Sequence, residues 1–115
     1  MRTQVIRINP QAPEEDKISN CAKILKNGAL VAFPTETVYG LAANLLNKKA
    51  IQRLYKVKRR SEGKPFSLHI AEKEKIEEHA INLTPTVYKL IDKFWPGPLT
   101  LILPSREGGS IGIRM

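Results

Sequence analysis

Residues 28–41 read Gly-Ala-Leu-Val-Ala-Phe-Pro-Thr-Glu-Thr-Val-Tyr-Gly-Leu and combine a short apolar run with a cluster of polar side chains. The apolar run, residues 29–33, has the length and composition of a buried β-strand. The polar cluster follows directly, and in α/β sheets ligands bind beyond the carboxyl ends of the strands. This stretch therefore predicts a core strand of an α/β fold with a candidate ligand site next to it.

Helices and strands alternate on both sides of this stretch. Before it, residues 3–8 predict a first strand, and a helix with acidic residues at its start follows Pro13 and closes at Asn27-Gly28. After it, the pattern predicts a helix capped by Asn47, a strand at 66–70, a charged helix over roughly 72–80, a helix that starts at Thr84-Pro85, and strands at 99–103 and 110–115. Such alternation is typical of an α/β domain.

The composition is that of a globular protein with excess positive charge. Its 115 residues suffice for one domain at most, and no apolar run is long enough to cross a membrane, so we expect no membrane partner. The single cysteine, Cys21, excludes an internal disulfide and favours a cytoplasmic location. Lys and Arg outnumber Asp and Glu by 19 to 11, which favours anionic partners such as nucleotides or RNA. Lysines that merely keep a protein soluble explain this excess equally well.

The polar cluster after the apolar run offers two hydroxyls, Thr35 and Thr37, beside a carboxylate and a phenol. A polar group of this kind between apolar runs suits a small polar ligand such as an amino acid. The alternative is a turn in which the Thr35 hydroxyl caps the backbone. From these residues alone the turn is slightly favoured.

A basic segment, residues 56–64, could bind phosphate or carboxylate groups. Lys58 stands seven residues after Ile51 and so continues the apolar stripe of its helix, which suggests a lysine that lines a cleft. The alternative is a set of solvated cations that complement the helix dipole. The spacing required for a phosphate-binding Walker loop is absent.

The third candidate is His69, which alternation places with Ser67 on the polar face of the strand at 66–70. The alternative is a partly buried histidine with one hydrogen bond. The histidines and the cysteine show no zinc-site spacing, and we predict no metal-binding residues. Without a GxSxG motif or a plausible triad, an enzyme built on these residues would work by positioning and by stabilising charge.

Together these segments resemble the Sua5/YrdC/YciO family, whose members include threonylcarbamoyl-AMP synthases. The resemblance begins near Lys23, runs to the last residue, and rests on residues 28–41, Lys58-Arg59-Arg60, the strand through His69, Phe-Trp-Pro-Gly-Pro-Leu-Thr at 94–100 and Gly-Ile-Arg-Met at 112–115. It implies a YrdC-like fold, a twisted mixed parallel and antiparallel sheet flanked by helices. It also implies that residues 1–115 are the N-terminal part of such a domain and that the C-terminal portion is absent.

The resemblance assigns the site residues. It implies that Lys58 and Arg60 are catalytic and bind the ATP phosphates and bicarbonate, with Lys64 and Arg114 as further ATP contacts. It implies that Thr37, with Thr35 nearby, and His69 hold threonine. Many members carry asparagine where this chain has Lys64, which keeps a donor and adds a charge. The Ser-x-Asn pair that completes the family's nucleotide site would lie beyond Met115.

The implied activity is that of an L-threonylcarbamoyladenylate synthase, a nucleotidyltransferase that makes threonylcarbamoyl-AMP and pyrophosphate from L-threonine, bicarbonate and ATP. The product serves the threonylcarbamoyladenosine modification of tRNA. Mg²⁺ would accompany ATP, and the partners would be tRNA or other RNA and the tRNA threonylcarbamoyltransferase machinery. Two alternatives stay open: a YrdC-like module that binds double-stranded RNA or tRNA without catalysis, and a carbamoyl-adenylate-forming domain. The two threonine hydroxyls favour threonine as substrate.

Overall fold

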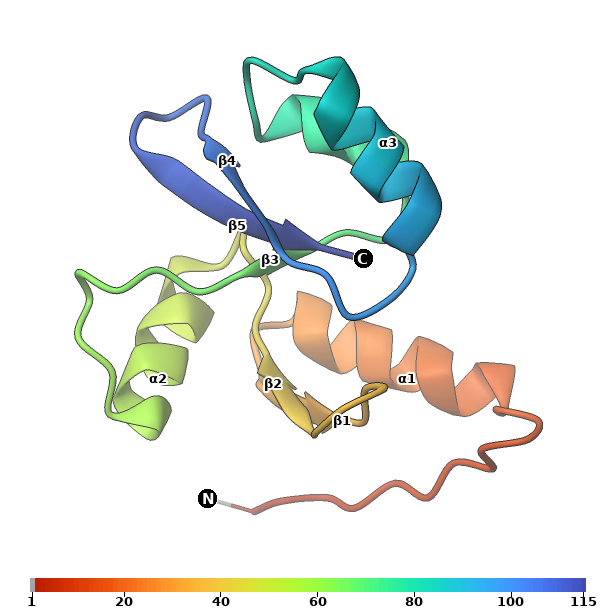
Figure 1. The fold of residues 1–115 in the computed structure, drawn as a ribbon. Coiled ribbons are helices and arrows are strands. Elements are labelled where there is room, and N and C mark those ends of the chain that lie inside the picture. Colours follow the sequence, from red (N-terminus) through yellow and green to blue (C-terminus); the bar gives the residue numbers. More distant parts are fainter. Residues whose placement is uncertain (1) are drawn as a thin grey trace. The chain divides into compact units, whose positions relative to one another are not determined.

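The computed structural model describes residues 2–115, which form two compact units (Figure 1). The first, Met1–Ser61, is called the N-terminal unit, and the second, Glu62–Met115, the C-terminal unit. Each contains helices and a small β-sheet. The predicted mixed α/β fold is confirmed, because the chain contains both parallel and antiparallel strand pairs as well as helices.

The N-terminal unit consists of two helices and a two-stranded sheet, in the order α1 (Glu15–Lys26), β1 (Val31–Phe33), β2 (Gly40–Ala42) and α2 (Lys48–Lys58). The strands β1 and β2 pair antiparallel. As predicted, α1 has acidic residues in its first turn and is closed by Asn27-Gly28: Asn27 is the C-cap, and Gly28 follows with a left-handed φ of 97°. The predicted Asn47 cap is also confirmed, since its side chain accepts a hydrogen bond from the backbone N–H of Ala50 at 3.0 Å.

Two strand predictions in this unit need correction. Residues 3–8 form no strand, because they pair with no other segment of residues 2–115, and a strand needs a partner for its backbone groups. The apolar run at 29–33 does contain β1, but its side chains alternate between partly buried and exposed instead of being fully buried. A two-stranded antiparallel sheet shields one face and leaves the other to solvent. The short strand β2 was not predicted, since Gly and Ala have low strand propensity.

The C-terminal unit comprises β3 (Leu68–His69), the 3₁₀ helix η1 (Lys73–Glu78), α3 (Pro85–Phe94), β4 (Leu101–Pro104) and β5 (Ser110–Arg114). Its sheet has the order β3-β5-β4, with β5 parallel to β3 and antiparallel to β4. Figure 1 shows η1 and α3 on one side of this sheet. The charged segment at 72–80 thus forms a 3₁₀ helix instead of the predicted α-helix, and a single large apolar side chain, Ile76, anchors it in the core.

The core lies in the C-terminal unit, between α3, η1 and the sheet. Its buried members come from all three: Ile76, Ala80, Val87, Ile91, Trp95, Leu101, Leu103 and Ile113. The Trp95 indole N–H donates to the carbonyl of Leu99 at 2.8 Å, so the one polar atom of this ring is satisfied as α3 ends. This packing fixes β3 and β5 and therefore the side chains that stand on their outer face.

Candidate functional site

The predicted site residues fall into local groups on different elements. Thr35 and Thr37 lie on the connection between β1 and β2, and Lys58 and Arg60 lie at the carboxyl end of α2. In the C-terminal unit, His69 lies on β3 and Arg114 on β5. Lys64 is exposed in the segment before β3 and belongs to none of these pairs.

The two threonines lie side by side in the turn that joins β1 to β2. Their hydroxyl oxygens are 3.3 Å apart. The Thr35 oxygen accepts hydrogen bonds from the backbone N–H groups of Thr37, at 3.3 Å, and Val38, at 3.2 Å, and its hydroxyl donates to the Val38 carbonyl. The Thr35 side chain thus stabilises the turn, in agreement with the alternative in which its hydroxyl caps the backbone. The Thr37 side chain is exposed on the same turn.

The end of α2 turns sharply at Arg59, which has a left-handed backbone with φ 51° and ψ 43°. The N–H of Arg59 donates to the Lys56 carbonyl at 3.2 Å, and that of Arg60 donates to the Tyr55 carbonyl at 3.0 Å. These bonds satisfy the last carbonyl groups of the helix in the position that glycine usually occupies. Lys58 is the last residue of α2, and its side chain is exposed. The lysine that was expected to line a cleft therefore lies at the carboxyl end of the helix.

His69 and Arg114 are brought together by the parallel pairing of β3 and β5. They are direct partners in the strand register, and the N–H of Ile70 donates to the Arg114 carbonyl at 3.0 Å. Paired residues on neighbouring strands point to the same side of a sheet. Residues 66–70 alternate as predicted, with Ser67 and His69 exposed and the apolar side chains partly buried. An imidazole and a guanidinium therefore share the outer face of this sheet.

One further residue of this face, Gly112, was not predicted. It stands two positions before Arg114 in β5, and a Cβ atom there would lie 3.3 Å from both the Ser67 hydroxyl oxygen and the Thr100 methyl carbon. Its φ is outside the left-handed region, so close approach and not backbone conformation explains the glycine. A glycine inside an expected strand was the signal in the sequence. Its lack of a side chain lets Ser67 and Thr100 pack closely over β5 beside Arg114.

Within residues 2–115, no group of three or more His, Cys, Asp or Glu side chains is placed to hold a metal ion. In the same residues no helix has the length and apolar character needed to cross a membrane.

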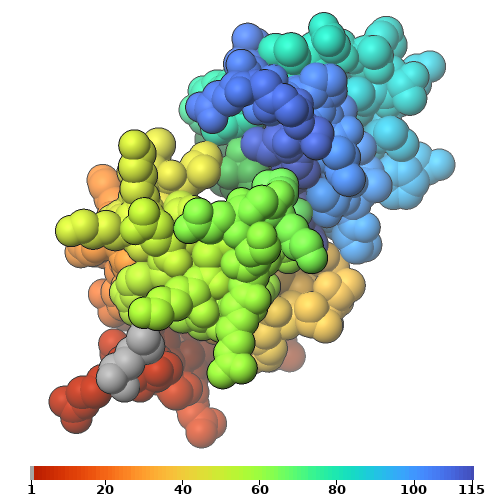
Figure 2. Space-filling view, turned by 90° about the vertical axis from the view of Figure 1, so that its left-hand side faces the viewer, coloured from red at the N-terminus to blue at the C-terminus, as the bar shows by residue number. Residues whose placement is uncertain are grey.

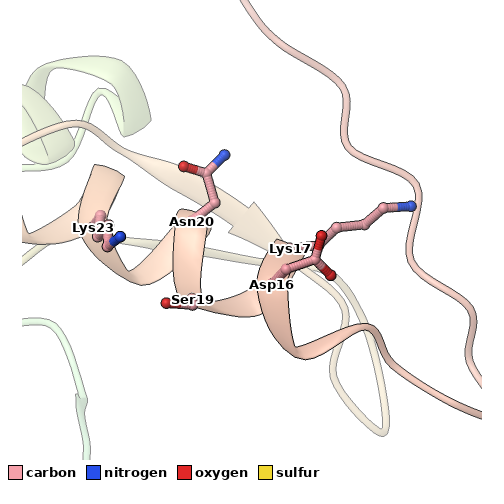
Figure 3. A pocket seen from close by; sticks show the side chains of 5 residues that line it. All are labelled: Asp16, Lys17, Ser19, Asn20 and Lys23. Carbon is pink, nitrogen blue, oxygen red and sulfur yellow. The ribbon is translucent and has the colours of Figure 1, made fainter.

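Figure 3 shows a hollow on α1 that contains none of the predicted site residues. It is lined by Asp16, Lys17, Ser19, Asn20 and Lys23. Lys17 reaches away to the N-terminal segment, where its Nζ donates to the Arg7 carbonyl at 2.7 Å.

A family model matches the part of the chain that includes the threonine turn and the strands β3 and β5. Residues 23–115 match the family model named Sua5_yciO_yrdC and described as "Telomere recombination". The chain belongs to the Sua5/YrdC/YciO family. The match includes the threonine turn, the end of α2, and the His69–Arg114 strand pair, so all the predicted site residues lie inside it.

Among curated relatives in this family, the chain is 47% identical to a threonylcarbamoyl-AMP synthase of Pyrococcus abyssi over 94 residues, 82% of this chain and 28% of the relative. It is 39% identical to a putative threonylcarbamoyl-AMP synthase of Methanocaldococcus jannaschii over 110 residues, 94% of this chain and 53% of the relative. The chain therefore spans between about a quarter and a half of the relatives it matches.

Solved structures of the Sua5/YrdC/YciO family agree with the fold. P. abyssi Sua5 in complex with L-threonine superposes with a TM-score of 0.84 at 41% identity, over 90% of this chain and 33% of that one. E. coli YciO gives a TM-score of 0.80 at 22% identity over 93% of this chain and 56% of that one, a likeness of fold alone. The region that this chain represents thus has the same fold as part of a threonine-binding relative.

Proposed function

We propose that this chain contributes to an L-threonylcarbamoyladenylate synthase, which forms threonylcarbamoyl-AMP and pyrophosphate from L-threonine, bicarbonate and ATP. The observation that carries the proposal is the likeness to P. abyssi Sua5, solved with L-threonine, over 90% of this chain at 41% identity. The synthases among the curated relatives support the same activity. In this proposal residues 1–115 are the N-terminal part of a YrdC-like domain.

The threonine substrate is held in this proposal by a hydroxyl and an imidazole. Thr37 is exposed on a turn that the Thr35 hydroxyl fixes, so it offers a preorganised donor and acceptor. His69 is exposed on the outer face of β3, where it is paired in register with Arg114 of β5. In the proposal both groups bind the amino acid through hydrogen bonds and leave its amine free to react.

The proposed reaction has two steps. The threonine amine attacks the carbon of bicarbonate, and loss of water leaves N-carboxythreonine. One carboxylate oxygen then attacks the α-phosphorus of ATP, the bond from that phosphorus to the bridging oxygen breaks, and pyrophosphate leaves with the bond's electron pair. Negative charge develops on the phosphate oxygens and on the leaving group. Lys58 and Arg60 stabilise that charge, and Lys64 and Arg114 add contacts to ATP.

The protein groups in this proposal are the cations of Lys and Arg, two threonine hydroxyls and one imidazole, a set that suits phosphate and carboxylate ligands. In the proposal Mg²⁺ accompanies ATP and neutralises the triphosphate. The product passes to the tRNA threonylcarbamoyltransferase machinery, in the cytoplasm.

The deciding experiment incubates the chain with ATP, Mg²⁺, bicarbonate and L-threonine and measures threonylcarbamoyl-AMP and pyrophosphate by mass spectrometry. Omission of threonine should abolish both products. A folded chain that makes carbamoyl-adenylate without threonine would instead support the carbamoyl-transfer alternative. A folded chain that makes neither adenylate would contradict the proposal for this polypeptide.

Matched variants test the assigned residues. Lys58→Ala and Arg60→Ala should abolish product, whereas Lys89→Ala on α3 also removes an exposed cation and should leave turnover unchanged. Thr37→Val should weaken L-threonine binding measured by NMR titration, and Thr86→Val on α3 is its control. Full turnover by Lys58→Ala would remove that lysine from the mechanism.

A further inference from the structure

The outer face of the C-terminal sheet is arranged around one buried row of side chains. Leu68 of β3 and Leu101 of β4 both pair with Ile113 of β5, and all three pack in or against the core. Because side chains alternate along a strand, the residues next to this row point to the outer face of the sheet. These residues are Ser67, His69, Thr100, Ile102, Gly112 and Arg114. In Figure 2 the darkest blue atoms, at the carboxyl end of the chain where β5 lies, are visible at the surface.

Two hydroxyl side chains converge over Gly112 in the middle of this face. A Cβ atom on Gly112 would lie 3.3 Å from the Ser67 hydroxyl oxygen and 3.3 Å from the Thr100 methyl carbon. Ser67 directly precedes β3 and Thr100 directly precedes β4, so the two side chains approach β5 from opposite sides. A side chain at position 112 would force at least one of them to move, and the glycine therefore allows both hydroxyl residues to be close together.

Both hydroxyl groups are available to a ligand. Ser67 and Thr100 are exposed, and within residues 2–115 neither hydroxyl makes a hydrogen bond to another protein group. They differ in this respect from Thr35, whose hydroxyl is hydrogen-bonded within its own turn. Each hydroxyl has one hydrogen to donate and two lone pairs to accept with. The face therefore offers two hydrogen-bonding groups that the protein itself does not use.

Arg114 adds a permanent positive charge beside these hydroxyls. It stands two residues after Gly112 on the same face of β5. Thr100 is next to Leu101, the partner of Ile113, so Thr100 and Arg114 are neighbours across the two strands. The Nε atom of Arg114 is buried, which shows that the inner part of its side chain is enclosed by neighbouring groups. None of the six residues of the face is acidic, so no carboxylate of the face competes for this charge.

We propose that Ser67, Thr100 and Arg114 form a subsite that binds an oxyanion, namely a phosphate or carboxylate group. A guanidinium can donate two parallel hydrogen bonds to such a group, and each hydroxyl can donate one more. The donors thus come from three neighbouring segments of one rigid sheet. The C-terminal unit contains seven basic and seven acidic residues, so its net charge does not attract anions and binding depends on these local groups.

This subsite deepens the proposed function, and its role in the reaction rests on that function. There Arg114 contacts ATP and the neighbouring His69 contacts threonine, so the oxyanion is either a phosphate of ATP or the carboxylate of the amino acid. Ser67 and Thr100 have no part in the reaction as proposed above. Oxyanion binding is measured without turnover, and the subsite and the reaction are therefore tested separately.

The test follows the NMR signals of the Gly112 amide and the Arg114 side chain while the chain is titrated with inorganic phosphate, ATP, acetate and L-threonine in turn. At least one probe should shift both signals at constant ionic strength. Ser67→Ala and Thr100→Val should each weaken binding of that probe about tenfold, the usual effect of one hydrogen bond to a charged group. Thr100→Val keeps a methyl group over Gly112 and so removes only the hydroxyl.

The two sources of the oxyanion are distinguished by the same titrations. Tighter binding of phosphate and ATP than of acetate and threonine assigns the subsite to the nucleotide, and the reverse order assigns it to the amino acid. If these affinities behave as expected but no adenylate is formed, the subsite stands and the proposed function fails.

A pair of variants tests the role of Gly112. Gly112→Ala should weaken binding, because the new methyl group displaces the Ser67 hydroxyl or the Thr100 methyl group. Adding Thr100→Ser removes that methyl group, keeps both hydroxyls and should restore part of the affinity, whereas a general loss of structure would not be repaired. Should Gly112→Ala unfold by circular dichroism, Ser67→Ala and Thr100→Val decide the question alone.

Ser110→Ala is the matched control, since Ser110 is exposed on β5 but pairs with Pro104, away from the central row. It should leave the affinity unchanged. An equal loss in Ser110→Ala, or an unchanged affinity in either Ser67→Ala or Thr100→Val, would overturn the proposal. So would a folded parent chain in which none of the four probes shifts the signals of Gly112 and Arg114.

Discussion

The two units of this chain differ in where their apolar side chains lie. The C-terminal unit buries a cluster of eight residues, in which Ile76, Ile91 and Ile113 are almost completely enclosed. In the described N-terminal unit only Ala50 and Leu54 are buried, and eight large apolar side chains are exposed there against four in the C-terminal unit. The N-terminal unit, which buries few apolar side chains, also carries the net positive charge of the chain. The buried apolar core therefore lies mainly in the C-terminal unit, and the excess of basic residues lies in the N-terminal unit.

The largest expected effect comes from the core of the C-terminal unit. Ile91→Ala should lower the free energy of unfolding by about 2–5 kcal/mol, because Ile91 is 2% exposed and its removal leaves a cavity. Ile18→Ala on α1 should cost less than about 1 kcal/mol, since Ile18 is 48% exposed. Urea unfolding followed by Trp95 fluorescence and by circular dichroism measures both. An equal loss of unfolding free energy in both variants would contradict the difference in core packing between the two units.

The sequence predicted elements best where local chemistry was strong. The caps and ends of the helices followed from Asn47, from Asn27-Gly28 and from Pro85, which are short-range signals. Strands were predicted less well, because a strand exists only when another segment pairs with it. Residues 3–8 had the right alternation but lack a partner, and β2 had no strand-like composition but is paired with β1.

A left-handed glycine in each unit allows a second comparison. Gly28→Ala should cost about 1–3 kcal/mol, because φ is 97° and the new Cβ would lie 2.5 Å from the Asn47 side chain that caps α2. Gly108→Ala has a similar φ of 93° but no atom within 4 Å of the Cβ, so it should cost about 1 kcal/mol. Thermal unfolding of the two variants separates backbone strain from the clash. A cost at Gly108 as large as that at Gly28 would contradict the coupling to Asn47.

The caps of α2 and α3 provide a smaller contrast. Asn47→Ala removes the hydrogen bond to the Ala50 N–H and should destabilise the protein by about 1 kcal/mol. Thr84 occupies the same position before α3 but makes no capping bond with its side chain, so Thr84→Ala should change stability by less than about 0.5 kcal/mol. The difference in stability is measured from the midpoints of denaturant unfolding, provided that the dependence of the unfolding free energy on denaturant concentration is the same in all variants. The reverse order would show that the cap of α2 contributes little to the N-terminal unit.

The candidate site was predictable to the extent that it depends on neighbours in sequence or in one strand. Thr35 and Thr37 are two residues apart, and His69 was placed on the polar face of its strand by alternation. The pairing of His69 with Arg114 depends on a parallel register across 45 positions, which no local pattern specifies. Gly112 was recognisable only as a glycine inside a strand, because its close neighbours Ser67 and Thr100 come from other segments.

The smallest expected effect concerns a hydrogen bond on the surface of the C-terminal unit. The Tyr88 hydroxyl donates to a Glu77 carboxylate oxygen at 3.0 Å. This bond, and to a smaller degree burial, raises the pKa of Tyr88 above its ordinary value of 10.0, because it stabilises the protonated phenol. Since the folded-state pKa is raised, the bond's contribution to stability is present below pH 10 and is lost as the pH rises through the raised value. Glu77→Gln should lower the pKa of Tyr88, measured as the difference in ultraviolet titration between each chain and its Tyr88→Phe partner. An unchanged pKa would show that the hydrogen bond to Glu77 does not govern the ionisation of the Tyr88 phenol.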